Sequence, residues 1–341
     1  MYIFEKTYCL KKFLIIRFSS IGDIVLTSPI IRCIDKQTDF EIHALTKHQN
    51  KEIFSNNPRV SKVYSFKDST NEILKNLISE GYDYVIDLQK NLRSVKLRKK
   101  LAVKSYSFPK VNIDKWIIVN FGINTLPKLH VVDRYFKAAE PLGIKNDNKG
   151  LEYYIPADDE IIPESIDINL KEGFVAFVIG GQHTTKILPA EKVADIISKL
   201  KLPAVLIGGS DDYNRGEDII KLLPNMGVLN LCGKFNLNQS ASLIKSSSIV
   251  MTNDTGLMHI AAAFEKPVVS FWGNTIPEFG MYPYLPSNDN LSFIAEIKNL
   301  RCRPCSKIGH KKCPKKHFKC MKNQDVASII EATNRLIIQG K

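Results

Sequence analysis

The sequence predicts an α/β protein made of two Rossmann-like, doubly wound parallel-sheet domains that face each other across a cleft. Short apolar runs alternate with helical segments, which is the pattern of parallel strands joined by crossover helices. The alternation occurs twice, and a polar stretch over 145–171 separates the two series. We therefore expect a first domain over 1–150 and a second over 151–322. A C-terminal helix over 323–341 is expected to pack back on the first domain.

The expected elements follow the apolar periodicity. In the first series we expect strands at 13–18, 40–45, 60–66 and 84–88, and helices at 24–36, 69–80, 91–102 and 130–142. In the second we expect strands at 174–179, 204–207, 228–231, 249–252 and 268–272, and helices at 189–200, 211–223, 237–245, 256–264 and 324–338. The two longest apolar runs, 13–16 and 116–123, are interpreted as core segments.

Composition and charge limit the class of protein. The 341 residues are 44% hydrophobic and 24% charged, which suits a soluble globular protein. No apolar run approaches the ~20 residues that span a bilayer, and the start, Met1–Lys6, has no apolar leader, so we expect a cytoplasmic protein. Residues 1–150 carry a net +11, 151–300 a net −7 and 301–341 a net +9. This asymmetry favours an anionic partner, although a solvated lysine-rich surface explains it equally well.

Two turns that follow strands carry candidate chemistry, because ligands of parallel sheets bind beyond the carboxyl ends of the strands. In Ser19-Ser20-Ile21-Gly22-Asp23, Gly22 permits a close backbone approach or a positive φ. Asp23 either caps the next helix, which the spacing favours, or acts as a general base. In the second turn, 180–186, two glycines, two hydroxyls and Lys186 suit an anionic group. The spacing of a P-loop is absent.

A third turn, Thr252-Asn253-Asp254-Thr255-Gly256, precedes the helix expected at 256–264. The amides of Thr255 and Gly256 would point outward at the positive end of the helix dipole, so a diphosphate is the natural ligand. Asp254 cannot attract a phosphate by charge, but it can accept hydrogen bonds from sugar hydroxyls. His259, on the first turns of the helix, is more often a packed residue than a catalytic one.

Together these stretches resemble glycosyltransferase family 9, the lipopolysaccharide heptosyltransferases, which have the GT-B fold. The specific stretches are 13–29, which contains Ser19-Ser20-Ile21-Gly22-Asp23, and 252–263, which contains Asn253-Asp254-Thr255-Gly256. Weaker matches are 84–89, Arg93-Ser94, 132–135, Pro267 and Trp272-Gly273-Asn274-Thr275. The resemblance covers nearly the whole chain.

The resemblance implies an inverting glycosyltransferase with a nucleoside-diphosphate-sugar donor, archetypally ADP-heptose, and an anionic lipopolysaccharide-core or other lipid-linked acceptor. It implies that Asp23 is the general base and that Lys186 stabilises the leaving diphosphate without a divalent metal. Asp254, Thr255, Gly256, Gly22 and His259 would line the donor site. Phe235 would lie beside the donor nucleoside, although a core aromatic is an equal interpretation. Arg93 and Arg134 would meet the acceptor, and the enzyme would contact the cytoplasmic face of the inner membrane peripherally.

Seven cysteines fall into two groups. Cys9, Cys33 and Cys232 are scattered and are interpreted as small core residues. The others form the pattern Cys302-x2-Cys305-x7-Cys313-x6-Cys320 among nine Lys and Arg residues over 301–322. Four thiolates could hold a structural zinc, with His310 and His317 as spare ligands, whereas reduced cysteines in an acceptor-binding loop are the alternative.

Other classes of protein stay open at this stage. A basic nucleic-acid-binding protein with a four-cysteine zinc module would use the basic segments, but it gives no reason for the Asp254-Thr255-Gly256 turn. A nicotinamide oxidoreductase lacks its Gly-x-Gly-x-x-Gly fingerprint after the first strand. A family member without activity is disfavoured because Asp23 and Lys186 are both present.

Overall fold

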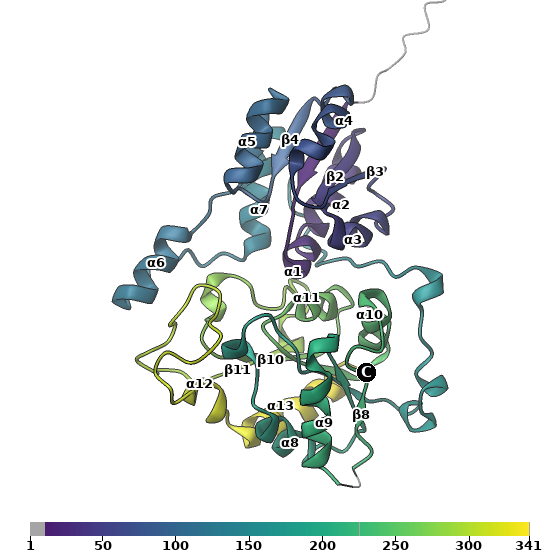
Figure 1. The fold of residues 1–341 in the computed structure, drawn as a ribbon, viewed down its shortest axis with the longest axis vertical. Coiled ribbons are helices and arrows are strands. Elements are labelled where there is room, and N and C mark those ends of the chain that lie inside the picture. Colours follow the sequence, from purple (N-terminus) through teal and green to yellow (C-terminus); the bar gives the residue numbers. More distant parts are fainter. Residues whose placement is uncertain (1–10, 225, 341) are drawn as a thin grey trace, which may run out of the picture. The chain divides into compact units, whose positions relative to one another are not determined.

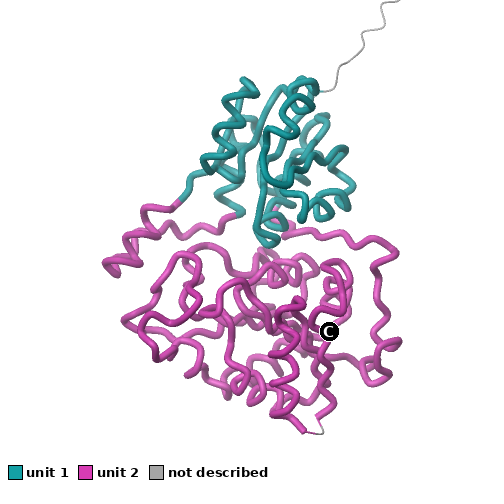
Figure 2. The backbone as a smooth tube through the Cα atoms, viewed as in Figure 1, with its two compact units in different colours: residues 1–110, 132–147 teal, residues 111–131, 148–341 magenta. Residues whose placement is uncertain are grey.

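The computed structural model describes residues 11–224 and 226–340, and the chain divides into two compact units (Figures 1 and 2). The first unit takes in residues up to 110 and 132–147, and the second takes in 111–131 and 148–341. The predicted boundary at 150 is close, but the segment 111–131 belongs to the second unit because Ile118 packs with Ile276 and Phe279. Met1–Lys6 and Cys9 lie outside the described residues.

The first unit is built on a five-stranded parallel sheet in the order β3-β2-β1-β4-β5. Its strands are β1 (Lys12–Ile16), β2 (Glu41–Lys47), β3 (Lys62–Phe66), β4 (Tyr84–Asp87) and β5 (Ser105–Ser107). Its α-helices are α1 (Ile21–Val25), α2 (Ser28–Gln37), α3 (Lys51–Ser55), α4 (Leu74–Ser79), α5 (Leu92–Leu101) and α7 (Val131–Ala139). The helix expected at 24–36 is divided into α1 and α2, because Pro29 lacks an N–H and is tolerated in the first turn of a helix.

The second unit has a six-stranded parallel sheet in the order β11-β10-β9-β6-β7-β8. Its strands are β6 (Val175–Val178), β7 (Ala204–Ile207), β8 (Leu229–Asn230), β9 (Ile249–Asn253), β10 (Val268–Trp272) and β11 (Ser292–Glu296). Its α-helices are α6 (Asn112–Phe121), α8 (Ala190–Ile197), α9 (Tyr213–Lys221), α10 (Leu237–Ser246), α11 (Gly256–Ala263), α12 (Lys319–Lys322) and α13 (Val326–Gln339). The strand at 268–272 is therefore not the last, since β11 extends the sheet beside it.

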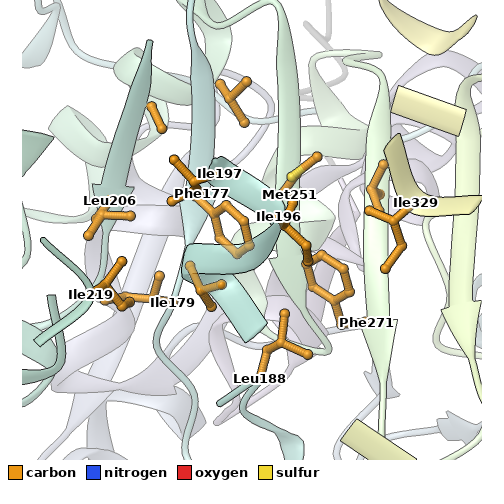
Figure 3. Close-up of a cluster of buried hydrophobic side chains, with 14 of the residues drawn as sticks. Phe177, Ile179, Leu188, Ile196, Ile197, Leu206, Ile219, Met251, Phe271 and Ile329 are labelled. Carbon is orange, nitrogen blue, oxygen red and sulfur yellow. The ribbon is translucent and has the colours of Figure 1, made fainter. Parts of the chain in front are cut away.

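The core of the second unit explains where its C-terminal helix lies. Phe177 of β6 and Phe271 of β10 stack with ring centroids 5.7 Å apart on one face of the sheet (Figure 3). Ile329 and Leu336 of α13 belong to the same buried cluster. The apolar face of this helix is therefore covered by the sheet of its own unit, and its packing on the first domain stays a prediction. No helix among the described residues is long and apolar enough to cross a membrane.

Each sheet has a switch point, where the chain order reverses between two neighbouring strands. In the first unit β1 lies between β2 and β4, and in the second β6 lies between β7 and β9. Loops that leave such neighbours diverge to opposite faces, which opens a crevice at the carboxyl edge of the sheet. The turns after β1, β4, β6 and β9 are thus the places where ligands are expected. The fold confirms the prediction of two doubly wound parallel-sheet domains.

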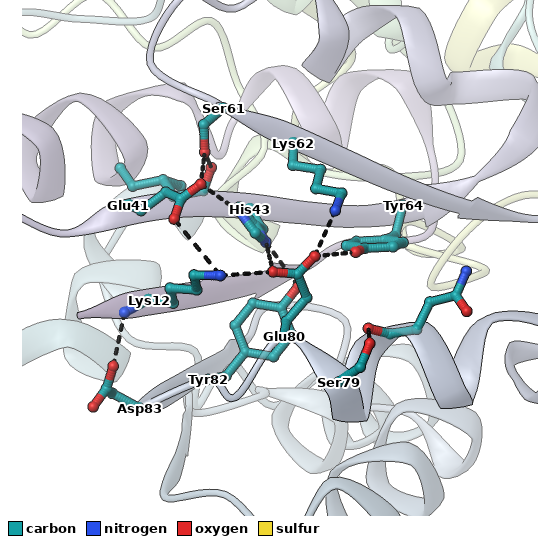
Figure 4. Close-up of polar contacts among 12 residues, drawn as sticks. Lys12, Glu41, His43, Ser61, Lys62, Tyr64, Ser79, Glu80, Tyr82 and Asp83 are labelled. Atoms are coloured by element: carbon teal, nitrogen blue, oxygen red, sulfur yellow. Dashed lines mark hydrogen bonds and ion pairs between the residues drawn. The ribbon is translucent and has the colours of Figure 1, made fainter. Parts of the chain in front are cut away.

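A polar network lies at the opposite, amino-terminal edge of the first sheet (Figure 4). Glu80, just after α4, accepts hydrogen bonds from Lys12 Nζ at 2.8 Å, from Lys62 Nζ at 2.5 Å and from the Tyr64 hydroxyl. Nearby, the buried His43 ring contacts the Tyr82 hydroxyl and a Glu41 carboxylate oxygen, each at 2.9 Å. The hydrogen bonds from Lys12, Lys62 and Tyr64 lower the pKa of Glu80 to about 2. The network therefore ties the starts of β1 and β3 to the end of α4.

We expect Glu80→Gln to destabilise the protein by about 2 kcal/mol at neutral pH, because two lysines lose their carboxylate partner. Because the pKa of Glu80 is lower in the folded state than in the unfolded chain, the ionised carboxylate stabilises the fold at pH values above the unfolded-state pKa. This stabilisation is lost as the pH falls toward 2. The difference between wild type and variant in urea unfolding should therefore shrink between neutral and strongly acidic pH. Glu140→Gln, at an exposed ion pair with Lys137, is the control and should cost at most ~0.5 kcal/mol at any pH.

Candidate functional site

The switch point of the second unit brings together side chains from three loops. Lys186, in the loop after β6, makes an ion pair of 2.5 Å with Asp254, in the turn after β9. Thr275, after β10, donates a hydrogen bond of 3.0 Å to the same Asp254 oxygen. Both charged side chains are mostly shielded, with 17% of Lys186 and 11% of Asp254 exposed. The two predicted residues therefore meet, and the cation of Lys186 already has a carboxylate partner.

Asn253, the last residue of β9, fastens the loop after β6 to this turn. Its side chain is buried, and its Nδ2 donates to the carbonyl oxygens of Val178 at 3.3 Å and Gly180 at 3.0 Å. Its Oδ1 accepts a hydrogen bond of 3.1 Å from the Leu188 amide. One amide side chain thus satisfies three backbone groups on either side of Lys186.

The start of α11 supplies backbone donors beside the ion pair. Thr255 is the N-cap residue and Gly256 begins the helix, so the first amides lack partners within the helix. Gly180 has no room for a side chain, since a Cβ there would lie 2.2 Å from Asp212 Oδ2. The next residue, Gly181, faces the start of α11, since a Cβ there would lie 3.7 Å from Thr255 Cγ2. The loop after β6 and the helix start thus form a small polar edge with positive amides and one neutralised lysine.

Two further residues, Phe235 and His259, were predicted to contact the donor. Phe235 follows β8 and is half-buried against the apolar cluster that contains Trp272 and Met258. His259 is 2% exposed within α11. The packing accounts for both residues as parts of the core, and their contact with a donor stays a prediction.

The switch point of the first unit holds Asp23. Asp23 Oδ2 accepts hydrogen bonds from the Ser20 amide at 3.1 Å and the Ser20 hydroxyl at 2.8 Å. The N-cap residue is therefore Ser20, and Asp23, the third residue of α1, reaches back to it as the second half of a capping box. Its Oδ1 forms an ion pair of 2.6 Å with Arg17, whose guanidinium is buried and also donates to the Leu88 carbonyl oxygen. Gly22 lies within α1 in helical conformation, so its predicted positive φ is not needed. Asp23 is thus held on both oxygens and remains 21% exposed.

The loop after β4 supports this turn. Gln89 Oε1 accepts a hydrogen bond of 2.9 Å from the Phe18 amide. The buried Asp87 accepts hydrogen bonds from the Lys90 amide at 2.7 Å and from Ser94 Oγ at 2.8 Å. Lys110 lies close enough to this cluster that burial and the Arg17 cation lower its pKa. Arg17 and Lys110 therefore give the surroundings of Asp23 a positive charge.

The two predicted acceptor residues differ in their surroundings. Arg93, in the first turn of α5, is exposed and lies over the Phe66 ring, with its guanidinium carbon 5.5 Å from the centroid. Arg134, in α7, is 4% exposed, and burial lowers its pKa. Arg98 of α5 pairs with Asp87 at 3.2 Å, so it serves the fold. Arg93 is therefore accessible to a ligand in a way that Arg134 is not.

The cysteine-containing loop, residues 301–322, is fastened to the edge that carries Lys186. The Thr185 hydroxyl accepts a hydrogen bond of 2.8 Å from the His310 amide, and Arg303 pairs with Glu296 at 2.6 Å while donating to the Gly273 carbonyl oxygen at 2.7 Å. Glycine is required at 309, where φ is +133° and a Cβ would lie 2.4 Å from the His183 side chain. The loop is thus part of the structure around the site.

The four thiols of this loop lie near one another. Burial raises the pKa of the Cys320 thiol to about 11, and the negative charge of the Cys305 and Cys313 thiolates acts in the same direction. Cys302 Sγ lies 3.7 Å from His317 Nε2. No group of three or more His, Cys, Asp or Glu side chains in residues 11–224 and 226–340 is arranged to hold a metal ion. The zinc interpretation of Cys302, Cys305, Cys313 and Cys320 gains no support from this geometry and stays a prediction. Cys33 and Cys232 are buried, as expected.

Several residues that build the site were not singled out as site residues from the sequence. Arg17 contacts Asp23, Thr275 contacts Asp254, and Asn253 holds the loop after β6 that carries Lys186. Asn274 is buried, and neither atom of its side-chain amide has a hydrogen-bond partner among the described residues. The one signal in the sequence was position, since each of these residues lies at or just after the end of a strand.

The fold and the two switch-point sites define the class of a two-domain glycosyltransferase. A family model described as glycosyltransferase family 9 (heptosyltransferase) matches residues 71–316. Lipopolysaccharide heptosyltransferase 1 of Campylobacter coli is 24% identical in an alignment 292 residues long, and the match covers 77% of this chain and 84% of that protein. The chain belongs to glycosyltransferase family 9.

Solved structures share the fold. The family 9 glycosyl transferase of Veillonella parvula superposes on this chain with a TM-score of 0.77 at 19% identity. The superposition covers 96% of this chain and 98% of that chain. The E. coli ADP-heptose lps heptosyltransferase II has a TM-score of 0.70 at 18% identity, with 96% of this chain and 99% of that chain covered. Both confirm the GT-B expectation for the fold.

We expect Asn253→Ala to lower the free energy of unfolding by about 2–4 kcal/mol, because three buried backbone groups lose their partner. Asn236→Ala at the N-cap of α10 is the control, since it also removes amide hydrogen bonds but at an exposed position, and should cost ~1 kcal/mol. Chemical denaturation measures both. A smaller loss for Asn253→Ala than for Asn236→Ala would contradict the role of Asn253.

Proposed function

We propose that this enzyme transfers a heptose or related sugar from an ADP-linked donor to a lipopolysaccharide-core or other lipid-linked acceptor, with inversion at the anomeric carbon. The ion pair Lys186–Asp254 at the switch point of the second unit carries the proposal. The names of its relatives support the choice of sugar, nucleotide and acceptor, since they include a lipopolysaccharide heptosyltransferase and an ADP-heptose lps heptosyltransferase.

The second unit is the proposed donor site. The diphosphate would bind at the start of α11, where the amides of Thr255 and Gly256 and the Lys186 cation supply positive charge. Asp254 would accept hydrogen bonds from the sugar hydroxyls while it keeps Lys186 in place. The buried, unsatisfied amide of Asn274 next to Thr275 supports a polar ligand at this edge.

The proposed reaction is a single displacement. The acceptor hydroxyl oxygen bonds to the anomeric carbon as the bond from that carbon to the diphosphate oxygen breaks, and ADP leaves with the electron pair. Negative charge grows on the diphosphate, where Lys186 and the α11 amides stabilise it without a divalent metal. Loss of one such donor typically costs ~2.7–4 kcal/mol of barrier.

The first unit contributes the proposed base. Asp23 would take the proton of the acceptor hydroxyl, and Arg17, 2.6 Å from its Oδ1, holds the carboxylate in one orientation. Arg93, exposed near the start of α5, is the better of the two candidates for contact with an anionic acceptor. Arg134 would then serve mainly to position α7.

The alternative of a basic nucleic-acid-binding protein with a zinc module is not supported. The family model covers residues 71–316, which include three of the four cysteines of the suggested zinc module. Elemental analysis of the purified protein tests the remaining structural-zinc prediction independently of activity.

A thermal-shift and calorimetric screen with ADP-, UDP-, GDP- and CMP-linked sugars tests the donor. We expect ADP-linked heptose to stabilise wild type by about 2–4 kcal/mol at saturating concentration. Asp254→Asn should bind the ADP-sugar about tenfold more weakly, yet bind free ADP at least as tightly, because Lys186 is released for the phosphates. Lys186→Gln should weaken both ligands. If no nucleotide sugar binds and Asp254→Asn behaves as wild type, the transferase proposal fails.

Asp23→Asn keeps the size and the hydrogen-bonding capacity of the side chain but removes the base. We expect kcat for transfer to fall by about 10²–10⁴-fold while donor affinity stays within twofold. Asp35→Asn, at an exposed ion pair with Arg59, is the matched control and should leave kcat unchanged. Undiminished turnover by Asp23→Asn would remove Asp23 from the role of base.

A further inference from the structure

Helix α6 exposes apolar side chains that the sequence analysis assigned to the core. Trp116 is 48% exposed, Phe121 63% and Ile113 74%, and Ile123 just beyond the helix is 59% exposed. The rings of Trp116 and Phe121 contact each other with centroids 5.3 Å apart. The prediction that 116–123 is a core segment is therefore wrong, because Ile118 alone among the described residues of α6 is buried.

The inner side of α6 explains its attachment. Ile118 packs with Ile276 and Phe279, and the Lys115 ammonium lies 4.8 Å from the centre of the Phe279 ring. The helix is thus fastened to the second unit by one side, and the opposite side carries large apolar groups in water. Such a contiguous exposed patch marks a surface that meets a protein or a membrane.

The cysteine-containing loop adds a dense positive charge. Residues 301–322 hold nine Lys and Arg side chains and no acidic residue. Seven of the nine are exposed: Arg301, Lys311, Lys312, Lys315, Lys316, Lys319 and Lys322. Ile308 in the same loop is 63% exposed. In the part of the chain that the structure describes, Arg303 is the one cation of this loop with a carboxylate partner.

The segment that follows α6 and a residue that pairs with the loop both line one cavity of about 580 Å³ in the second unit. The chain just after α6 lines it with Leu126 and Leu129, and Glu296 lines it from the end of β11. Glu296 is the carboxylate that pairs with Arg303 of the loop. The apolar helix and the basic loop are therefore connected parts of a single unit.

We propose that α6 and the loop 301–322 form a surface that docks on an anionic phospholipid bilayer. The apolar side chains of α6, with Trp116 and Phe121 at their centre, enter the boundary between headgroups and acyl chains, where aromatic rings are favoured. The exposed lysines bind the headgroup phosphates. The choice of a membrane rests in part on the proposed function, because a lipid-linked acceptor resides in one.

Other occupants fit these observations less well. A second copy of the chain, joined by two-fold symmetry, would bring two loops of nine cations toward each other, and like charges oppose such a contact. Nucleic acid would satisfy the lysines but would leave the apolar side of α6 exposed to water. A bilayer with anionic headgroups satisfies both the apolar and the cationic groups.

Vesicle flotation of the full-length protein tests the proposal. Wild type should float with vesicles containing about one third phosphatidylglycerol and much less with pure phosphatidylcholine, and high salt should reduce the bound fraction. Trp116→Ser with Phe121→Ser should lower the partition coefficient at least about tenfold. Replacing three lysines of the loop, Lys311, Lys312 and Lys315, by Gln should also lower the partition coefficient at least about tenfold, but only for the anionic vesicles.

Matched controls distinguish binding through this surface from nonspecific binding to vesicles. Ile162→Ser with Ile168→Ser removes apolar groups of similar exposure elsewhere in the unit, 67% and 69%, and should leave flotation within twofold of wild type. Replacing three other exposed lysines by Gln controls for the loss of positive charge; these are Lys51, Lys75 and Lys171. If Trp116→Ser with Phe121→Ser fails to fold by thermal unfolding, Ile113→Ser with Ile123→Ser takes its place.

The proposal is overturned if the α6 variants float like wild type, or if wild type does not bind anionic vesicles. It is also overturned if sedimentation velocity shows that α6 mediates self-association and the variants merely become monomeric. Transfer to a water-soluble, deacylated acceptor should be unchanged in the α6 variants. Failure of wild type on every acceptor would count against the proposed function and would leave the vesicle result standing by itself.

Discussion

The side chain of Asn253 joins the two loops on which the candidate site of the second unit depends. Parallel β6 and β9 end side by side, but their loops leave toward opposite faces, so nothing in the sheet itself would keep the loops in register. The Asn253 amide supplies that link through Val178, Gly180 and Leu188. Lys186 can meet Asp254 because the chain on both sides of Lys186 is held in this way, and the loop 301–322 is fastened in turn through Thr185.

The sequence was sufficient for the architecture because both sheets are buried on two faces, and such strands appear as apolar runs. Val268–Trp272 was expected with its observed bounds, whereas β11, with half-buried Phe293 and Ile294 in a segment of mixed polarity, has no such signal. The candidate site was found for a related reason, since its residues follow strands. Asn253 was missed as a support because its hydrogen-bond partners lie 65 or more positions away and leave no mark in local spacing. Arg17 was missed because it lies within the apolar run 13–18, which was interpreted only as a strand.

Helix α6 is the clearest case in which composition misleads. An apolar helical segment is normally buried, so hydrophobicity alone assigns 116–123 to the core. Burial, however, depends on whether another element covers each side of the helix. Here Ile276 and Phe279 cover one side, and Trp116 and Phe121 on the other remain exposed. The same limit explains the assignment of 111–131 to the wrong domain, because the few contacts that hold it come from residues more than 140 positions later.

The Lys186–Asp254 ion pair also bears on how the enzyme would choose among the anions of the cell. A lone buried lysine would attract phosphate of any kind, whereas a lysine that already has a carboxylate at 2.5 Å offers little net charge to a small competitor. In the proposed donor complex the phosphates would approach Lys186 while several sugar hydroxyls donate to Asp254, and inorganic phosphate, which has no sugar, does not offer this combination. Under the proposed reaction, the nucleotide that remains after transfer lacks the sugar hydroxyls, so the loss of their hydrogen bonds to Asp254 would favour departure of the product before the next turnover.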